Sequence, residues 1–125
     1  MLGKTDPTPM IAVKDLDRAR AFYEETLGLT TIETLGEEVV SMKSGDTKID
    51  VYRSEFAGSN KATALTFNVD DIATEVTNLK DKGVMFEHYD TMDGLTLNGD
   101  VYEGEGMKTA WFKDPDGNIL SLIEA

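Results

Sequence analysis

The sequence predicts an α+β fold in which a unit of one strand, one helix and several further strands occurs twice. The first observation is an internal repeat: residues 8–16 align with residues 64–72, so that Asp15 falls on Asp71. The second is a change of hydrophobic period after each run, from the alternation of a strand to the spacing of a helix. The length of 125 residues suits one domain over residues 1–125.

Both helices are predicted from an aspartate at the start and a glycine at the end. Asp15 and Asp71 suit the N-cap, because a carboxylate accepts hydrogen bonds from the free N–H groups of the first turn. Gly28 and Gly83 supply the left-handed residue that often follows the last turn. Apolar residues at helical spacing lie between them: Leu16, Ala19, Phe22, Tyr23 and Leu27 in the first helix, and Ile72, Val76 and Leu79 in the second.

Strand-like runs account for most of the remaining chain. After the first helix they cover residues 29–34, 38–43 and 48–53, and after the second helix residues 84–89, 107–113 and 119–123. Residues 90–106 are rich in Gly, Asp and Glu. We expect a loop there, or a loop with an irregular edge strand.

Charge and composition exclude several classes of function. The chain has 24 acidic and 12 basic residues, a net charge of -12, one histidine and no cysteine. Such an acidic excess disfavours nucleic acids and anionic membranes and favours cationic small molecules. Without cysteine there is no thiol nucleophile and no cysteine-built metal site. With no apolar leader segment and no run of about 18 apolar residues, we expect a cytoplasmic protein.

Side-chain alternation gives each predicted strand a core face and a second, semi-polar face. Ile49 and Val51 are core residues by type, so Asp50 and Tyr52 face the other side. A surface that is neither core nor densely charged is typical of a small-ligand cleft. We therefore expect the ligand to contact this face in both halves, through Met10, Asp50, Tyr52, Thr66, Asn68, Thr109, Trp111 and Ser121.

Two segments of the chain form recognisable motifs: residues 13–28, VKDLDRARAFYEETLG, and residues 111–120, WFKDPDGNIL. Both resemble motifs of the vicinal oxygen chelate superfamily, which includes glyoxalase I, extradiol dioxygenases and bleomycin-resistance proteins. The resemblance implies two βαβββ modules, about 1–58 and 59–125, which form a curved, cup-shaped mixed sheet around a ligand site. It also implies a homodimer, because a second subunit often completes the cup. Both segments are structural motifs, so they identify the scaffold and not the reaction.

Metal-dependent members of this family carry ligands at four positions, from which this chain departs. By alignment of the motifs these positions hold Thr8, Asp50, Ala64 and Ser121. A catalytic metal typically needs about three protein ligands, and of these residues only Asp50 is a good one. We therefore expect no cofactor. The alternative is a divalent ion near Asp50, held with acidic residues such as Glu103 or Glu105 or across a dimer.

Asp50 and Trp111 each have two interpretations. Asp50 either pairs with a cationic ligand or is a strand aspartate bonded to Thr8, Arg53 or water, and in both cases a buried carboxylate requires a partner. Trp111 either floors the pocket, where stacking on a cation would gain about 0.5–2 kcal/mol, or fills the dimer seam or the cup itself. We favour the pocket for Trp111 and leave Asp50 open.

His88 is the only imidazole in the chain. It is either a general base tuned by Glu87 or Asp90, or a histidine on an edge strand. Its parity matches Val84 and Phe86, which should face the helix, so we favour the edge histidine.

An acidic stretch covers residues 87–105 and contains no lysine or arginine. It is either an electrostatic rim for a cationic ligand or a solvated loop, and we favour the solvated loop. Met92 and Tyr102 within it would suit a lid over the pocket. Its six carboxylates are Glu87, Asp90, Asp93, Asp100, Glu103 and Glu105.

Two functions of different classes remain. The first is a metal-free, non-catalytic protein that sequesters a small cationic or aromatic compound, in the manner of bleomycin-resistance proteins. The second is a metal-dependent enzyme with non-standard ligands, either a glyoxalase I-type lyase or isomerase or an extradiol dioxygenase-like enzyme. Because three of the four usual ligand positions are Thr8, Ala64 and Ser121, the sequence favours the binder and leaves catalysis open.

Overall fold

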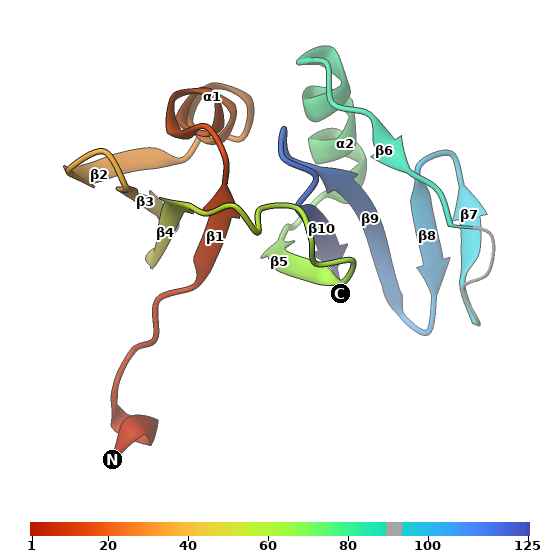
Figure 1. The fold of residues 1–125 in the computed structure, drawn as a ribbon. Helices are drawn as coiled ribbons and strands as arrows, with labels where there is room; N and C mark the ends of the chain where they lie inside the picture. Colours follow the sequence, from red (N-terminus) through yellow and green to blue (C-terminus); the bar gives the residue numbers. More distant parts are fainter. Residues whose placement is uncertain (90–93) are drawn as a thin grey trace. The chain divides into compact units, whose positions relative to one another are not determined.

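The structure is a computed structural model that describes residues 1–89 and 94–125. The chain divides into two compact units, unit 1 over Met1–Ala57 and unit 2 over Gly58–Ala125. In each unit a helix packs on one face of that unit's own sheet (Figure 1). No helix among the described residues is long and apolar enough to cross a membrane.

Unit 1 contains one strand, one helix and three further strands. After a short 3-10 helix (Leu2–Lys4) come β1 (Met10–Val13), α1 (Leu16–Ala21) with a π-helical turn (Phe22–Thr26), β2 (Thr30–Leu35), β3 (Val39–Ser44) and β4 (Thr47–Arg53). The sheet order is β1-β4-β3-β2. β1 and β4 are parallel, and the other neighbours are antiparallel. The expected βαβββ module is confirmed in this unit.

The first helix begins where the sequence predicts and widens in its second half. The Asp15 side chain accepts a hydrogen bond from the backbone N–H of Arg18 at 3.2 Å, as an N-cap should. In the π-helical turn the N–H of Leu27 donates to the carbonyl of Phe22 at 3.1 Å. Tyr23 is fully buried, so the apolar stripe of the helix faces the sheet as expected.

Unit 2 repeats this plan with additional strands. Its elements are β5 (Thr63–Asn68), α2 (Ile72–Asp81), β6 (Phe86–Glu87), β7 (Thr96–Asn98), β8 (Val101–Gly104), β9 (Met107–Lys113) and β10 (Ile119–Glu124). The sheet order is β5-β10-β9-β8-β7, and β6 also pairs with β9. β5 and β10 are parallel, as β1 and β4 are in unit 1.

Two carboxylates cap the N-terminus of α2. Asp71 accepts a hydrogen bond from the backbone N–H of Thr74 at 3.2 Å, as its position in the sequence predicts. Glu124, at the end of β10, accepts a second one from the N–H of Ile72 at 3.0 Å. The second contact ties the helix to the sheet and has no counterpart in the local sequence pattern.

Residues 94–106 are more regular than the sequence analysis expected. β7 and β8 form a hairpin in which Asn98 lies opposite Val101, and β8 in turn pairs with β9. The two-residue loop Gly99-Asp100 begins with a glycine at φ 66°, a common hairpin connection. The sequence predicts a loop because residues 90–106 are rich in Gly, Asp and Glu, so the glycine of this hairpin turn is not recognised from composition. Asp90, Met92 and Asp93 lie outside the described residues.

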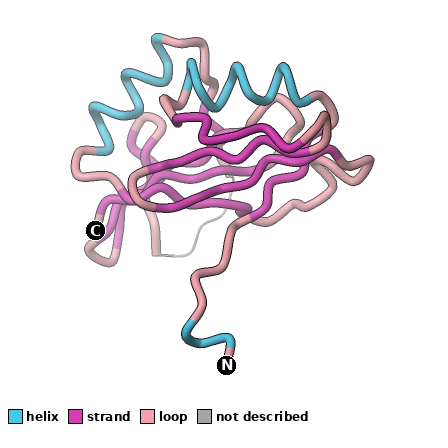
Figure 2. The backbone as a smooth tube through the Cα atoms, turned by 90° about the vertical axis from the view of Figure 1, so that its left-hand side faces the viewer, coloured by secondary structure: helices cyan, strands magenta, loops and turns pink. Residues whose placement is uncertain are grey.

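The core of each unit lies between its helix and its sheet, and in each unit the helix runs along one face of that unit's own strands (Figure 2). Fully or nearly fully buried side chains come from both elements: Val13, Tyr23, Met42, Ile49 and Val51 in unit 1, and Ile72, Ala110, Phe112 and Leu120 in unit 2. The opposite face of each sheet, here called the polar face, is therefore left for other contacts.

Candidate functional site

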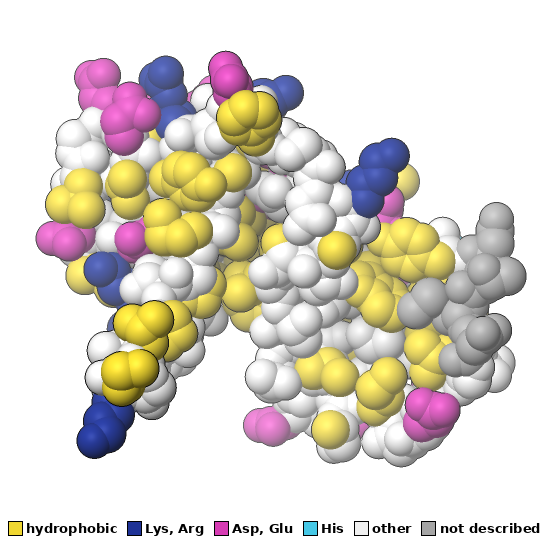
Figure 3. All heavy atoms as spheres, turned by 60° about the horizontal axis from the view of Figure 1, so that its bottom comes forward, with side chains coloured by type: hydrophobic (Ala, Val, Ile, Leu, Met, Phe, Trp, Pro, Cys, Tyr) yellow, Lys and Arg dark blue, Asp and Glu magenta, His cyan; other side chains and the backbone are white. Residues whose placement is uncertain are grey.

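The polar face of unit 1 carries three of the residues expected to contact a ligand. Met10, Asp50 and Ser41 lie side by side on β1, β4 and β3, and Tyr52 lies in the next row opposite Val39. The Met10 side chain is 52% exposed, Asp50 and Tyr52 are half-buried, and Ser41 is buried. In Figure 3, which looks at the molecule from below, hydrophobic side chains reach the surface in both units.

Asp50 has a partner that the sequence analysis did not name. The Ser41 hydroxyl donates a hydrogen bond to Oδ1 of Asp50 at 2.6 Å. Arg53, one of the expected partners, instead lies 4.0 Å from Glu38. Because a hydrogen bond to a charged group is stronger than one between neutral groups, Ser41 fixes the carboxylate in place on the polar face.

The polar face of unit 2 carries the other expected contact residues. Thr66, Ser121 and Trp111 lie side by side on β5, β10 and β9. The hydroxyls of Thr66 and Ser121 are 2.6 Å apart and form a hydrogen bond. The sequence predicts that these three residues share a face, because all of them alternate with core positions, and the strand register adds that they form one row.

Asn68 and Thr109 occupy the next row of the same face, on either side of Ile123. Asn68 is exposed, whereas Thr109 is buried and its hydroxyl donates to the carbonyl of Leu122 at 2.9 Å. The hydroxyl hydrogen of Thr109 is thus engaged within the sheet, and Asn68 is the residue of this row with a side chain open to solvent.

Trp111 belongs to an aromatic cluster with Tyr89 and Tyr102. Its ring centroid is 5.6 Å from that of Tyr89 and 5.4 Å from that of Tyr102, both in edge-to-face geometry. The indole N–H donates to the hydroxyl of Thr63 at 3.1 Å. Trp111 remains half-buried. The position of the indole is therefore fixed by two ring contacts and one hydrogen bond, and its side chain is still partly exposed to solvent.

Tyr102 and Tyr89 are themselves joined. The buried Tyr102 hydroxyl donates to the carbonyl of Tyr89 at 3.1 Å and also accepts from its backbone N–H. Burial raises the pKa of Tyr89, and the negative charge of Glu87 raises it further. Tyr89 thus stays neutral at physiological pH. Tyr102, expected as part of a lid, is instead fixed in the sheet by these bonds.

The family's usual metal does not fit the side chains at the four aligned positions. Ala64 has no donor atom, and Thr8 and Ser121 offer only hydroxyls, the latter bonded to Thr66. Asp50 alone is a good ligand. Within residues 1–89 and 94–125, no three histidine, aspartate or glutamate side chains lie together as a metal site would require.

His88 lies on the helix side of the unit 2 sheet and not on the polar face. Its Nε2 atom is 2.8 Å from Oδ1 of Asp100, whose Oδ2 accepts a hydrogen bond from Lys80 of α2 at 2.8 Å. The pKa of Asp100 lies below its ordinary value. The largest cause is the hydrogen bond from Lys80, and the hydrogen bond with His88 lowers it further. This position agrees with the strand parity that favoured an edge histidine.

Two members of the acidic stretch are compensated locally. Asp100 pairs with Lys80, as described above, and Glu87 lies 3.2 Å from the ammonium group of Lys113. Glu103 lies directly opposite Lys108 on the neighbouring strand. These contacts favour a structural role for much of the stretch over a rim of free negative charge.

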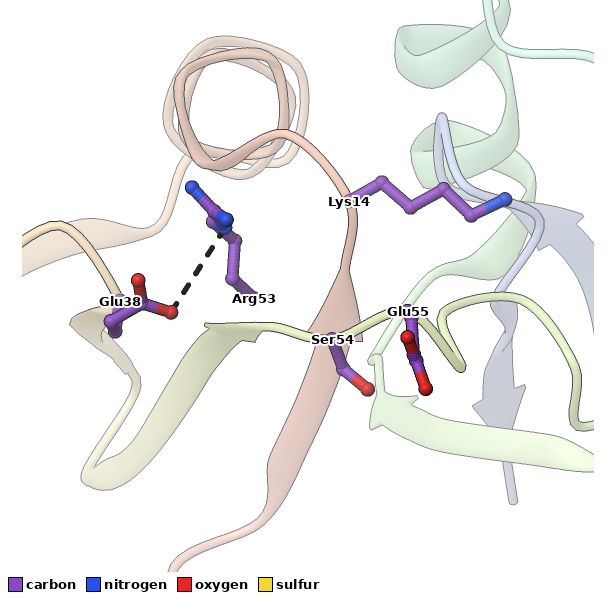
Figure 4. Close-up of a pocket in the computed structure, with 5 residues that line it drawn as sticks. All are labelled: Lys14, Glu38, Arg53, Ser54 and Glu55. Carbon is purple, nitrogen blue, oxygen red and sulfur yellow. Dashed lines mark ion pairs between the residues drawn. The ribbon is translucent and has the colours of Figure 1, made fainter.

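A charged pocket that the sequence analysis missed lies at the ends of β1 and β4 in unit 1 (Figure 4). It has a volume of about 350 Å³ and is lined by Lys14, Glu38, Arg53, Ser54 and Glu55. Lys14 extends away from the Glu38–Arg53 pair. Small-ligand pockets are mostly apolar with a few polar groups, so this charged lining is not typical of a small-ligand site.

Comparison with known proteins identifies the same scaffold. The model of the Glyoxalase/Bleomycin resistance protein/Dioxygenase superfamily matches residues 7–122. A glyoxalase family protein from Enterococcus faecalis superimposes with a TM-score of 0.74 at 22% identity, over 99% of this chain and all 100% of the other. Lactoylglutathione lyase from Agrobacterium tumefaciens gives 0.72 at 19% identity, over 98% and 94%.

An antibiotic binding protein, TnmS3 from Streptomyces sp. CB03234, gives a TM-score of 0.63 at 18% identity, over 97% of both chains. No curated protein matches the chain. At these identities the likeness concerns the fold alone. Since an enzyme and an antibiotic binding protein share it, the fold by itself does not identify the function.

Proposed function

The chain belongs to the glyoxalase/bleomycin resistance protein/dioxygenase superfamily, and from this premise we propose that it binds a small cationic or aromatic molecule without a metal ion. On the polar face of unit 1 the candidate contact residues are Met10, Asp50 and Tyr52. On the polar face of unit 2 they are Thr66, Asn68, Thr109, Trp111 and Ser121.

The aromatic cluster is the observation that carries this proposal. Trp111 is held by Tyr89, Tyr102 and the bond to Thr63, yet it stays partly accessible. A surface already fixed in its bound conformation loses little entropy when a ligand docks. Stacking of a cation on an indole contributes about 0.5–2 kcal/mol, depending on desolvation.

Charge supports a cationic ligand. The net charge of -12 raises the local concentration of cations around the protein. On the polar face of unit 1, Asp50 holds its carboxylate in place through Ser41 at 2.6 Å. A positioned carboxylate recognises a cationic group with little further ordering.

Metal-dependent catalysis is the weaker candidate because of donor chemistry. One carboxylate and two hydroxyls at the aligned positions do not resemble the nitrogen and carboxylate donors of catalytic divalent sites. His88, the only imidazole, lies on the helix side of its sheet in contact with Asp100.

A thermal-shift experiment tests the proposal. We expect benzyltrimethylammonium or bleomycin to raise the Tm of the protein, because a ligand that binds only the folded state stabilises it. Trp111→Ala should fold and lose the response, whereas Trp111→Phe, which keeps an aromatic face, should retain part of it.

Removal of metal is the matched control. Dialysis against EDTA should leave the Tm and the ligand response unchanged. A stoichiometric divalent ion in the purified protein, or a Tm that falls on chelation, would refute the metal-free binder.

A further inference from the structure

Two lysines lie side by side on the polar face of unit 1. Lys43 on β3 and Lys48 on β4 are directly opposite each other in the antiparallel register. Their neighbours Met42 and Ile49 are buried in the core, so both lysines point to the same face as Asp50. Both are exposed.

This pair is electrostatically unfavourable as it stands. Residues directly opposite in an antiparallel pair have Cβ atoms about 4.5–5.5 Å apart, and like charges there destabilise the sheet. The chain has twice as many acidic as basic residues, so partners are abundant. Nevertheless, among the described residues neither lysine forms an ion pair, although other basic side chains do, including Arg20, Arg53, Lys80, Lys108 and Lys113.

A carboxylate row lies next to this lysine pair. On β3 Ser41 precedes Lys43 by two residues, and on β4 Asp50 follows Lys48 by two residues. The row formed by Ser41 and Asp50 therefore lies about 7 Å from the lysine pair. Oδ1 of Asp50 accepts the Ser41 hydroxyl, and Oδ2 accepts no hydrogen bond from the described residues. Glu33 of β2 lies opposite Ser41 and adds a second carboxylate to the row.

We propose that this face binds a zwitterionic molecule whose carboxylate lies between Lys43 and Lys48 and whose cationic group lies at Asp50. The two charges of the ligand are then about 7 Å apart, the spacing of alternate residues on a strand. The inference rests on the proposed function and specifies the class of ligand that the same site selects.

The net charge of the protein favours a zwitterion over a simple anion. At -12 the chain repels a free anion, whereas a zwitterion has no net charge to be repelled. The bound carboxylate also relieves the repulsion between Lys43 and Lys48. A cation without a carboxylate leaves that repulsion in place.

A set of three related benzene derivatives tests this assignment. 4-(Aminomethyl)benzoate carries both charges at the two ends of the ring, 4-methylbenzylamine carries only the cation, and 4-methylbenzoate only the anion. Titrations followed by ¹H–¹⁵N NMR should show the tightest binding for 4-(aminomethyl)benzoate, with shifts at the amides of residues 41–50. High salt should weaken it.

Variants separate the lysine pair from overall charge. Lys43→Gln and Lys48→Gln should each weaken binding of 4-(aminomethyl)benzoate about threefold, and the double variant about tenfold, as expected for partly exposed ion pairs. Lys61→Gln removes the same charge from an exposed residue of unit 2 and should leave the affinity unchanged. Neither lysine variant should lower the Tm.

The outcomes also separate this inference from the proposed function. If the double variant binds 4-(aminomethyl)benzoate as the original protein does, or if that compound does not bind, the zwitterion assignment is overturned. The proposed function then still stands provided that benzyltrimethylammonium raises the Tm in a manner dependent on Trp111. Loss of that response overturns the proposed function instead.

Discussion

Ser41 determines where the carboxylate of Asp50 lies. It is fully buried and donates to Oδ1 at 2.6 Å. The sequence contained the information for this contact: the two-residue turn Gly45-Asp46 pairs Ser44 with Thr47, and the same register brings Ser41 opposite Asp50. Alternation alone assigned Asp50 to a face and gave it no partner.

Ser41→Ala should lower the free energy of unfolding by about 1–2 kcal/mol, because it removes a hydrogen bond to a charged, half-buried group. Urea denaturation measures the loss. Ser44→Ala, at a half-buried position on the same strand, should change stability by no more than about 0.5 kcal/mol. Equal effects of the two changes would show that the contact with Asp50 has no energetic role.

Asp50→Asn should leave the protein folded and reduce its affinity for benzyltrimethylammonium. The amide oxygen still accepts the Ser41 hydroxyl, so the structural bond is kept while the charge is lost. Isothermal titration calorimetry with both proteins measures the difference. A variant that unfolds would mean that the charge of Asp50 serves the core and not the ligand.

Asp100 predicts a dependence of stability on pH. Hydrogen bonds from Lys80 and His88 lower its pKa in the folded protein. The ionised carboxylate therefore stabilises the fold above its unfolded pKa of about 3.9, and this stabilisation is lost as the pH falls through the lower folded value. In urea denaturation, the difference between the original protein and Asp100→Asn should shrink as the pH falls below about 5.

Asp6→Asn is the control for this experiment, since Asp6 has no hydrogen bond or ion pair among the described residues. Its stability should follow that of the original protein at every pH. If the difference in stability between the original protein and Asp100→Asn did not shrink in acid, the negative charge of Asp100 would not contribute to the stability of the fold.

Elements were predictable wherever their signal is local. The N-caps Asp15 and Asp71, the duplicated strand and helix, and β9 (Met107–Lys113) all follow from spacing and residue type. The hairpin of β7 and β8 was missed because its acidic composition outweighed its Gly99 turn signal. The contacts of Asp100 with α2 and of Glu124 with Ile72 join residues distant in sequence, so no local pattern reveals them.

The turn over residues 114–118 depends on a close approach of Gly58 within unit 2. Gly58 has a φ of 72°, and a Cβ atom there would lie 2.0 Å from the carbonyl oxygen of Asp116. Gly106 has a similar φ of 77° with open space around it. The two glycines therefore differ in steric contact and not in backbone conformation.

Gly106→Ala should destabilise the protein by about 1–2 kcal/mol, the cost of a left-handed conformation alone. Gly58→Ala should destabilise it by more than about 3 kcal/mol, because the backbone of the turn must also move. Thermal and urea denaturation measure both. Equal losses would show that the turn yields easily to the added methyl group.

At the scale of the whole molecule, several large apolar side chains remain exposed, including Phe56 at 71%, Met85 at 83% and Ile32 at 51%. Single exposed apolar side chains are common on protein surfaces, so the expectation of a homodimer rests on the family resemblance and not on these residues. A homodimer would have a mass of about twice the 13.8 kDa of one chain in sedimentation equilibrium. A monomer at micromolar concentration would contradict this expectation.

Most of the acidic excess lies in the second half of the chain. Residues 63–125 contain 13 acidic and four basic residues, and in the acidic stretch Glu87 and Asp100 are each engaged in an ion pair. Part of the charge therefore holds unit 2 together. The remainder creates the long-range field that favours cationic and zwitterionic ligands over anions.

The emission of Trp111 tests the central claim most directly, because it is the only tryptophan in the chain. After EDTA treatment, titration with benzyltrimethylammonium should change this emission to saturation, and 1 M salt should weaken the binding by shortening the Debye length to about 3 Å. An emission that stays constant at millimolar ligand, or that responds only after a divalent metal is restored, would contradict a metal-free site at the aromatic cluster.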